Sequence, residues 1–265
     1  MSRTSAETGA PAGGTTTDAH VRYVLALADD TLVAAQRLGE WVASAPVLEE
    51  DVALANIGLD LLGQARALLA HAGALEGRGR DEDALAYFRD ERDFLNVHLV
   101  ERDNGDFAVT MARLLVLTAY LKQLWSALQP STDATIAAIA AKAVKEAGYH
   151  VEHARMWVLR LGDGTPESHR RMQAGLDAEW PFVDELFDDG FVDDALLEAG
   201  VAVRPSSLRE AWLAEVAAVV SEATLTLPDV PPAVTGGRRG IHTEQMGYLL
   251  AEMQHLARSH PGASW

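Results

Sequence analysis

The feature that most constrains this fold is the recurrence of apolar residues at helical spacing in four long segments. Residues three, four and seven apart share one face of a helix, so each segment predicts a long helix with one buried face. Strand-like composition is confined to residues 219–227. We therefore expect an all-α fold. The four predicted helices are residues 24–42, 52–69, 107–128 and 136–161.

Prolines mark the ends of these segments, because proline cannot donate the hydrogen bond needed inside a helix. Thr165 followed by Pro166 is typical of an N-cap and first helical turn. Pro181 falls inside an otherwise helical stretch and predicts a kink or a new helix start. Four prolines lie between periodic runs: Pro46, Pro130, Pro166 and Pro205.

Long helices in pairs, followed by shorter ones, predict a four-helix bundle with additional C-terminal helices. Residues 1–18 are rich in Ser, Thr, Gly and Ala and have no periodicity, so we expect a disordered tail. Residues 19–265 then form one helical domain.

Charge and cysteine content exclude several functions. Lys and Arg number 22 against 39 Asp and Glu, which gives a formal charge of −17. Such a surface repels the phosphates of nucleic acids and anionic lipids. The chain has no cysteine, which rules out disulfides, thiolate nucleophiles and Cys-ligated metals. No uninterrupted apolar run approaches the ~20 residues of a membrane span, and no secretion signal is recognisable.

Some four-helix bundles hold two iron or manganese ions between their helices. The ligands are a Glu from each of two helices and a Glu-x-x-His from each of the other two. Glu40 is a lone carboxylate in the first predicted helix. In the second helix Asp60 is followed three residues later by Gly63, which cannot ligate a metal.

The other two helices are equally incomplete. The third has no Asp or Glu between residues 107 and 128. In the fourth, Glu146 is followed three residues later by Tyr149. A site lacking a carboxylate and an imidazole should bind iron weakly, so we expect neither catalytic residues nor a metal site in this chain.

Three other patterns are weaker. Glu146, His150 and His153 form a possible metal cluster on one helix, but a hydrogen-bonded network is the commoner outcome. Glu252 and His255 match Glu-x-x-His without a second copy, which favours a surface position. Residues 236–240 (GGRRG) lack the Lys-Ser/Thr ending of a phosphate-binding loop and favour a flexible basic turn before a helix that begins near Thr243.

Longer stretches resemble a known family. The chain is similar, over nearly everything after residue 20, to the non-catalytic C subunits of bacterial phenylacetyl-coenzyme A epoxidase complexes. The resemblance rests on residues 35–41 (AQRLGEW), 51–66 (DVALANIGLDLLGQAR), 89–92 (RDER), 145–150 (KEAGYH), 236–244 (GGRRGIHTE) and 250–254 (LAEMQ).

This resemblance implies a ferritin-like fold, a cytoplasmic location and a place in phenylacetate breakdown. It implies pairing with a separate A subunit that carries the di-iron centre, and contacts with other subunits of the complex. The complex uses oxygen and NADPH, with flavin and iron–sulfur groups in its reductase, to epoxidise the aromatic ring of phenylacetyl-coenzyme A. This chain would support that reaction without a cofactor of its own.

Two further expectations concern partner and substrate. We predict a large apolar interface on the first and second helices, including Trp41. Arg238 and Arg239 are candidate contacts to the phosphates of coenzyme A, because of their charge and glycine-rich setting.

Two other functional classes stay open. The first is an independent di-metal oxidase or oxygenase with unorthodox ligands at Glu40, Asp60, Glu146 and His150. The second is a binding or regulatory bundle unrelated to oxygen chemistry.

Overall fold

The computed structural model describes residues 16–263, and every regular element within them is a helix. The all-α prediction is therefore confirmed for this part of the chain. The α-helices are α1 (Thr16–Gly39), α2 (Leu48–Glu76), α3 (Glu82–Tyr87), α4 (His98–Glu101), α5 (Phe107–Leu128), α6 (Ala134–Gly162), α7 (Pro166–Glu179), α8 (Asp194–Glu198), α9 (Arg209–Glu222) and α10 (Glu244–Ser259). Short 3-10 helices are η1 (Glu91–Asp93), η2 (Trp180–Phe187), η3 (Asp189–Phe191), η4 (Pro205–Leu208) and η5 (Gly237–Arg239).

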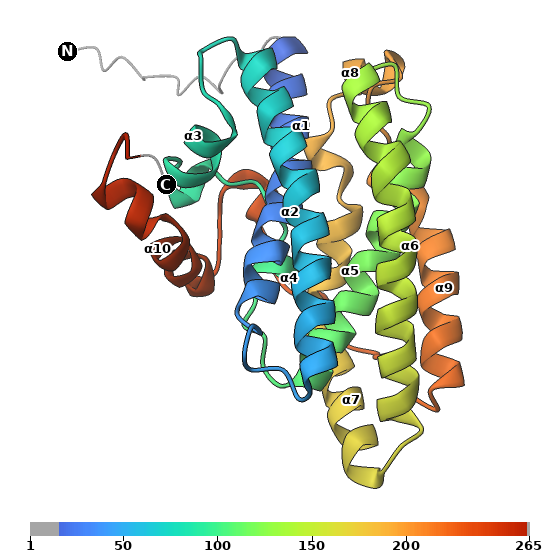
Figure 1. Cartoon of the computed structure of the whole chain (residues 1–265). Helices are drawn as coiled ribbons and strands as arrows, with labels where there is room; N and C mark the ends of the chain where they lie inside the picture. The colour runs from blue at the N-terminus through green and yellow to red at the C-terminus, as the bar shows by residue number, and fades with distance from the viewer. Residues whose placement is uncertain (1–15, 264–265) are drawn as a thin grey trace, which may run out of the picture.

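The four predicted long helices are α1, α2, α5 and α6, and they lie side by side (Figure 1). α1 packs along α2, α5 packs along α6, and contacts between α2 and α6 join the two pairs. α7 and α9 pack against α5 and α6. α1 begins at Thr16, inside the segment predicted to be a tail, and residues 1–15 lie outside the described residues.

The helix boundaries follow from local capping. The Thr165 hydroxyl accepts a hydrogen bond from the Ser168 N–H at 3.1 Å, with Pro166 in the first turn, as predicted. Asp133 caps α6 by accepting from the N–H groups of Thr135 and Ile136. Pro181 lies in the first turn of η2, so it marks a helix start rather than a kink inside α7.

By length and composition α2 and α5 would each pass as a membrane span, although Asp60 and Arg66 interrupt the apolar run of α2, and Arg113 and Lys122 that of α5. The core helix of a soluble protein passes the same test, and 78% of the apolar window of α5 is buried inside the protein. For α2 the buried share is only 44%. α2 therefore exposes more of its apolar surface than α5 does.

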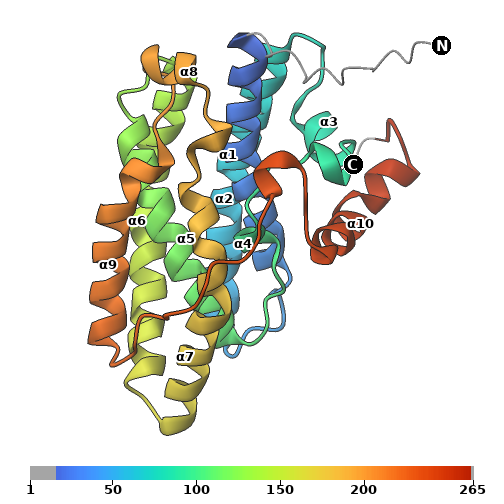
Figure 2. The same ribbon diagram turned by 180° about the vertical axis from the view of Figure 1, so that it is seen from behind.

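The C-terminal part of the chain returns to the first pair of helices. After α9 an irregular segment crosses the face of the helical body, as the view from behind shows (Figure 2). It ends at α10, which packs against α3 and contacts α1. Segments from opposite ends of the sequence thus share one core.

Candidate functional site

The two positions assigned to lost histidines, one on α2 and one on α6, point away from the space between the long helices. Gly63 is exposed and Tyr149 is 78% exposed, so a histidine at either place would face solvent. The residues that face inward are Leu61 on α2 and Ala147 on α6, which are fully or almost fully buried. The assignment of Gly63 and Tyr149 as the places of lost ligands was therefore wrong, because it mistook the inward-facing phase of both helices.

Three polar pairs bridge α2 and α6, and we call them the α2–α6 polar ladder. They are Asp60–His150 at 3.0 Å, Gln64–Glu146 at 3.0 Å and Glu50–His153 at 3.2 Å. Burial lowers the pKa of His150 and of His153, so both imidazoles are neutral near pH 7. Each histidine faces a carboxylate of its own.

The polar ladder does not converge on one point. Glu146 is held by Gln64 and by Lys142 at 3.0 Å, so it does not join the two histidines. These contacts favour the hydrogen-bonded network over the one-helix metal cluster. Glu252 and His255 are both exposed, as expected.

Sequence reasoning missed one cluster. Among residues 16–263, the ligand atoms of His20, His71 and Asp133 lie within 4.8 Å of one another, close enough to hold a metal ion. The three come from separate segments, so no spacing in the sequence could signal their meeting. Only Asp133 carried a local signal, as a residue typical of an N-cap.

The interior between α1, α2 and α5 is packed mainly with apolar side chains. It contains a cavity of about 20 Å³, which is room for about one water. Its wall includes Leu38, Leu61, Leu114 and Leu117. Glu40 lies outside this wall and is exposed, with hydrogen bonds from Arg37 at 2.6 Å and from Asn104 at 3.0 Å. The side chains of this interior therefore pack against one another, and among the described residues that line the cavity there is no cluster of carboxylates to bind a metal.

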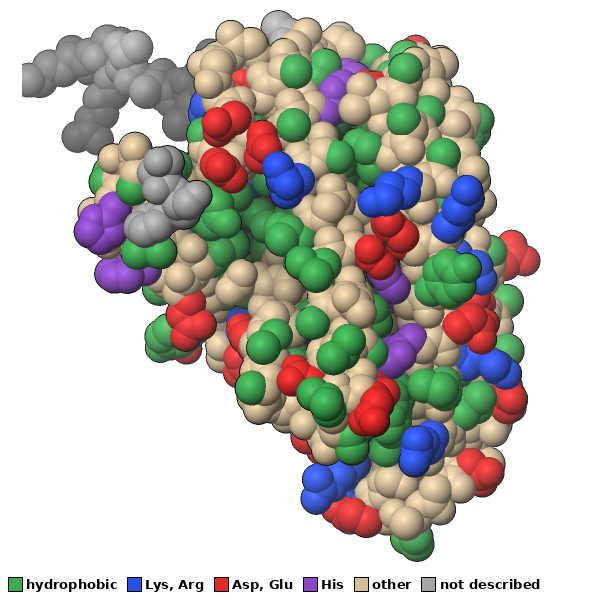
Figure 3. Space-filling view, viewed as in Figure 1, with side chains coloured by type: hydrophobic (Ala, Val, Ile, Leu, Met, Phe, Trp, Pro, Cys, Tyr) green, Lys and Arg blue, Asp and Glu red, His purple; other side chains and the backbone are tan. Residues whose placement is uncertain are grey.

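Exposed apolar side chains form one stripe on each helix of the α2–α6 pair. On α2 they recur at helical spacing, and on α6 they lie seven residues apart, which returns to the same face. Figure 3 shows apolar side chains over α2 on this face, with histidine and acidic groups in the line between the two helices. We call this surface the α2–α6 apolar face: Leu48, Val52, Leu59, Leu62, Tyr149 and Met156.

The first helix does not provide such a surface. Every residue from Tyr23 to Ala34 in α1 is buried within the chain itself. Trp41 is partly buried, donates a hydrogen bond to Thr110 at 3.1 Å and packs edge-on against Phe107. The prediction of an interface on α1 and Trp41 is corrected, because these groups are used in the chain's own core.

Arg238 is also corrected as a candidate phosphate contact. It is 3% exposed, and its guanidinium pairs with Asp30 at 2.7 Å and donates to the carbonyl groups of Ala26 and Leu95. Arg239 is exposed and donates to the Thr235 carbonyl at 3.0 Å, so it alone could reach a ligand.

The glycines of the GGRRG segment serve packing. A Cβ placed on Gly237 would lie 1.9 Å from the Asn96 carbonyl oxygen, so only glycine fits there. The Gly237 N–H donates to Glu185 at 2.8 Å. The turn before α10 is therefore confirmed, but its expected flexible and basic character is corrected, because most of the segment is buried and Arg238 is used inside the protein.

Comparison with known proteins agrees with the family resemblance that was stated from the sequence. The family model described as "Phenylacetic acid catabolic protein" matches residues 1–265. The C subunit of the 1,2-phenylacetyl-CoA epoxidase of Escherichia coli (strain K12) is 53% identical over 243 residues, which cover 92% of this chain and 98% of that protein. The resemblance stated from the sequence is confirmed. This chain belongs to the phenylacetic acid catabolic protein family.

Proposed function

We propose that this chain is a structural, non-catalytic subunit of a phenylacetyl-CoA epoxidase complex, in which it pairs with a di-iron A subunit. The observation that carries the proposal is the α2–α6 apolar face, which is left uncovered on a chain 53% identical to a protein named as an epoxidase subunit. Apolar side chains exposed together commonly mark a protein–protein interface.

The proposed fold is a ferritin-like four-helix bundle of α1, α2, α5 and α6, with the later helices added to it. In such a bundle a di-metal centre would lie between the long helices. Here buried leucines occupy the space between α1, α2 and α5, and Glu40 lies outside it. This packing favours a supporting role over the alternative of an independent di-metal oxidase.

A partner bound to the α2–α6 apolar face would also bury polar side chains of the α2–α6 polar ladder. The α2–α6 polar ladder lies between the two apolar stripes, so docking would also remove the half-exposed Asp60 side chain from water. Because its partner His150 is already in place at 3.0 Å, that carboxylate would enter the interface with a hydrogen bond made. A carboxylate that already accepts a hydrogen bond costs less to bury than one whose oxygens have no partner.

The proposed complex works in the cytoplasm in aerobic phenylacetate catabolism. The A subunit would hold the iron, and a reductase with flavin and iron–sulfur groups would pass electrons from NADPH. This chain would hold the helices of the A subunit in a productive geometry, since misplacement by about 1 Å can cost about a hundredfold in rate. Arg239 stays a candidate contact to the phosphates of coenzyme A.

The test is reconstitution with an A subunit and a reductase. We expect this chain and the A subunit to elute together in size-exclusion chromatography. We also expect phenylacetyl-CoA epoxidation to be faster with this chain than without it, and none from this chain with the reductase alone. A chain that stays separate from the A subunit would refute the proposal.

Metal analysis separates the alternatives. The chain purified anaerobically and alone should hold far less iron than the A subunit. About two irons per chain, together with oxygen consumption in the absence of the A subunit, would instead establish an independent di-metal oxidase. A pull-down that recovered only proteins without iron would favour a regulatory bundle.

A further inference from the structure

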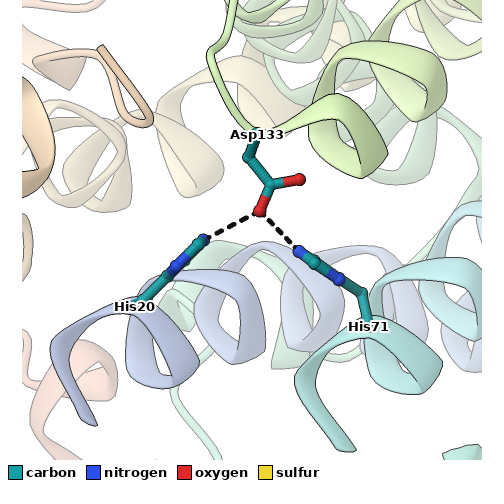
Figure 4. A group of neighbouring side chains, drawn as sticks. All are labelled: His20, His71 and Asp133. Atoms are coloured by element: carbon teal, nitrogen blue, oxygen red, sulfur yellow. Dashed lines mark hydrogen bonds and ion pairs between the residues drawn. The ribbon is translucent and has the colours of Figure 1, made fainter. Parts of the chain in front are cut away.

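Three helix ends bring two histidines and an aspartate together at one end of the molecule. His20 lies in the second turn of α1, His71 lies near the C-terminal end of α2, and Asp133 is the N-cap of α6. Figure 4 shows both imidazoles pointing at the same carboxylate from neighbouring helices. The arrangement depends on the antiparallel packing of α1, α2 and the start of α6.

The ligand atoms are close enough to share one ion. Asp133 Oδ2 lies 2.7 Å from His71 Nε2 and 3.1 Å from His20 Nε2. His20 Nε2 is buried and makes no hydrogen bond of acceptable geometry, although it faces that oxygen. A buried imidazole nitrogen without a hydrogen bond is a costly arrangement, which a bound cation would relieve.

We propose that His20, His71 and Asp133 form a zinc-binding site with three protein ligands and one position left for water. Two imidazole nitrogens and one carboxylate oxygen are a donor set that suits Zn²⁺. Tetrahedral zinc with bonds of about 2.1 Å separates its donors by about 3.4 Å. On binding, the His20–Asp133 distance of 3.1 Å therefore opens by about 0.3 Å and the His71–Asp133 distance of 2.7 Å by about 0.7 Å, which rotations of the imidazoles supply.

The carboxylate is already oriented for this role. Asp133 Oδ1 accepts hydrogen bonds from the Thr135 N–H at 2.8 Å and the Ile136 N–H at 3.0 Å. These bonds fix the side chain and leave Oδ2 directed at the two imidazoles. Outer hydrogen bonds of this kind orient the ligands of protein metal sites.

The site is also accessible and ready to ligate. The side chains of His20, His71 and Asp133 are 16%, 12% and 9% exposed, so an ion can reach them from solvent. Zinc binds the neutral form of an imidazole, through the lone pair of its unprotonated nitrogen.

The proposed zinc site is separate from the proposed interface. His71 lies beyond Leu62 by about 14 Å along α2, toward the end of the helix. Zinc would join the ends of α1, α2 and α6 and so stabilise the fold, because metal that binds only the folded chain adds its binding free energy to folding. The site also departs from the sequence-based expectation that this chain holds no metal.

The test is a zinc titration of the chain without a polyhistidine tag, after treatment with a chelator and its removal. Competition with a chromophoric chelator should give one zinc bound per chain. Co²⁺ in place of zinc should give the intense visible absorption of a tetrahedral site. Failure of the wild-type chain to bind zinc at this stoichiometry would overturn the proposal without any variant.

Variants locate the site. His71→Ala and His20→Ala should each weaken zinc binding by about tenfold or more and remove the cobalt bands. His255→Ala is the matched control, because His255 is an exposed histidine on α10. It should bind zinc as the wild type does. Wild-type affinity in His71→Ala would overturn the assignment.

Asp133→Asn tests the carboxylate, because asparagine can still cap α6 while it loses the charge. We expect weaker zinc binding with an unchanged helical content by circular dichroism. Zinc should raise the Tm of the wild type and leave that of His71→Ala unchanged. An equal rise in both would mean that zinc binds elsewhere.

Discussion

The Arg238 guanidinium lies 2.7 Å from the Asp30 carboxylate in the interior of the protein, with both side chains 2% exposed. Asp30 belongs to the middle of α1, and Arg238 belongs to η5 just before α10. The guanidinium also donates to the carbonyl groups of Ala26 and Leu95. This ion pair therefore fixes the returning C-terminal segment onto the first helix.

Replacing Arg238 should destabilise the fold strongly. Arg238→Ala leaves the Asp30 carboxylate buried without its partner, and loss of one member of a buried pair costs about 3–5 kcal/mol. Urea unfolding followed by circular dichroism measures the change. Arg239→Ala is the matched control, because Arg239 is exposed next to it, and should stay within about 0.5 kcal/mol of the wild type. Equal effects of the two variants would contradict the structure.

The stability contributed by His242 should depend on pH. Its Nδ1 lies 2.7 Å from Glu101 and its Nε2 lies 2.9 Å from the Phe94 carbonyl, so the doubly protonated ring finds two acceptors. Burial alone would lower the pKa of His242, but Glu101 outweighs it and holds that pKa above 6.5. Likewise burial would raise the pKa of Glu101, but His242 and Thr243 hold it below 4.5.

The linkage between protonation and folding sets how the free energy of unfolding changes with pH. A histidine whose pKa is raised in the folded state contributes stability below pH 6.5, and loses it as pH rises through the raised pKa. The free energy of unfolding should therefore differ most between wild type and His242→Gln at pH 4.5–6.5, above the ordinary pKa of Glu101. This difference should shrink toward alkaline pH. A difference that grew above pH 7 would show that His242 is neutral in the folded protein.

Neighbouring leucines on α2 should respond differently to the same change. Leu61 is fully buried beside the small cavity, and Leu61→Ala should cost about 2–5 kcal/mol because it enlarges that space. Leu62 is 36% exposed, so Leu62→Ala should cost far less. Thermal or urea unfolding of the isolated chain measures both. Similar losses would mean that α2 is rotated from the orientation described.

Charges on the α2–α6 apolar face should break the proposed complex without unfolding the chain. Leu59→Asp and Tyr149→Asp change side chains that are 63% and 78% exposed, so the isolated fold should tolerate them. Each should weaken binding to the A subunit by about tenfold or more, because a carboxylate would be buried in an apolar contact. Leu213→Asp is the control, because Leu213 is 39% exposed but lies on α9, outside this face. Size-exclusion chromatography and calorimetry measure the binding. Unchanged affinity in Tyr149→Asp would place the interface elsewhere.

Most of the helical framework could be predicted from the sequence. The four long helices appear where the apolar period placed them, and Thr165 with Pro166 begins α7 as expected. These features depend on residues within a few positions of one another. The start of α1 at Thr16 was missed because its first turns are polar, so the apolar period begins only later.

The candidate site was less predictable. Gly63 and Tyr149 were assigned inward positions on α2 and α6, yet both are exposed. Arg238 was expected at the surface and is buried. The template of ligand spacing gives separations along a helix, but it does not say which face of that helix meets its neighbours.

The sequence by itself determined the helical class, the acidic and cysteine-free chemistry, and the resemblance to an epoxidase subunit. Only the tertiary structure decided that Arg238 reaches Asp30, that His20 and His71 meet at Asp133, and that one face of α2 stays uncovered. The physical reason is the separation along the sequence of the residues that interact. Helix formation and capping are settled by neighbours in the chain, whereas these meetings depend on how helices far apart in sequence rotate and slide until their apolar faces are buried.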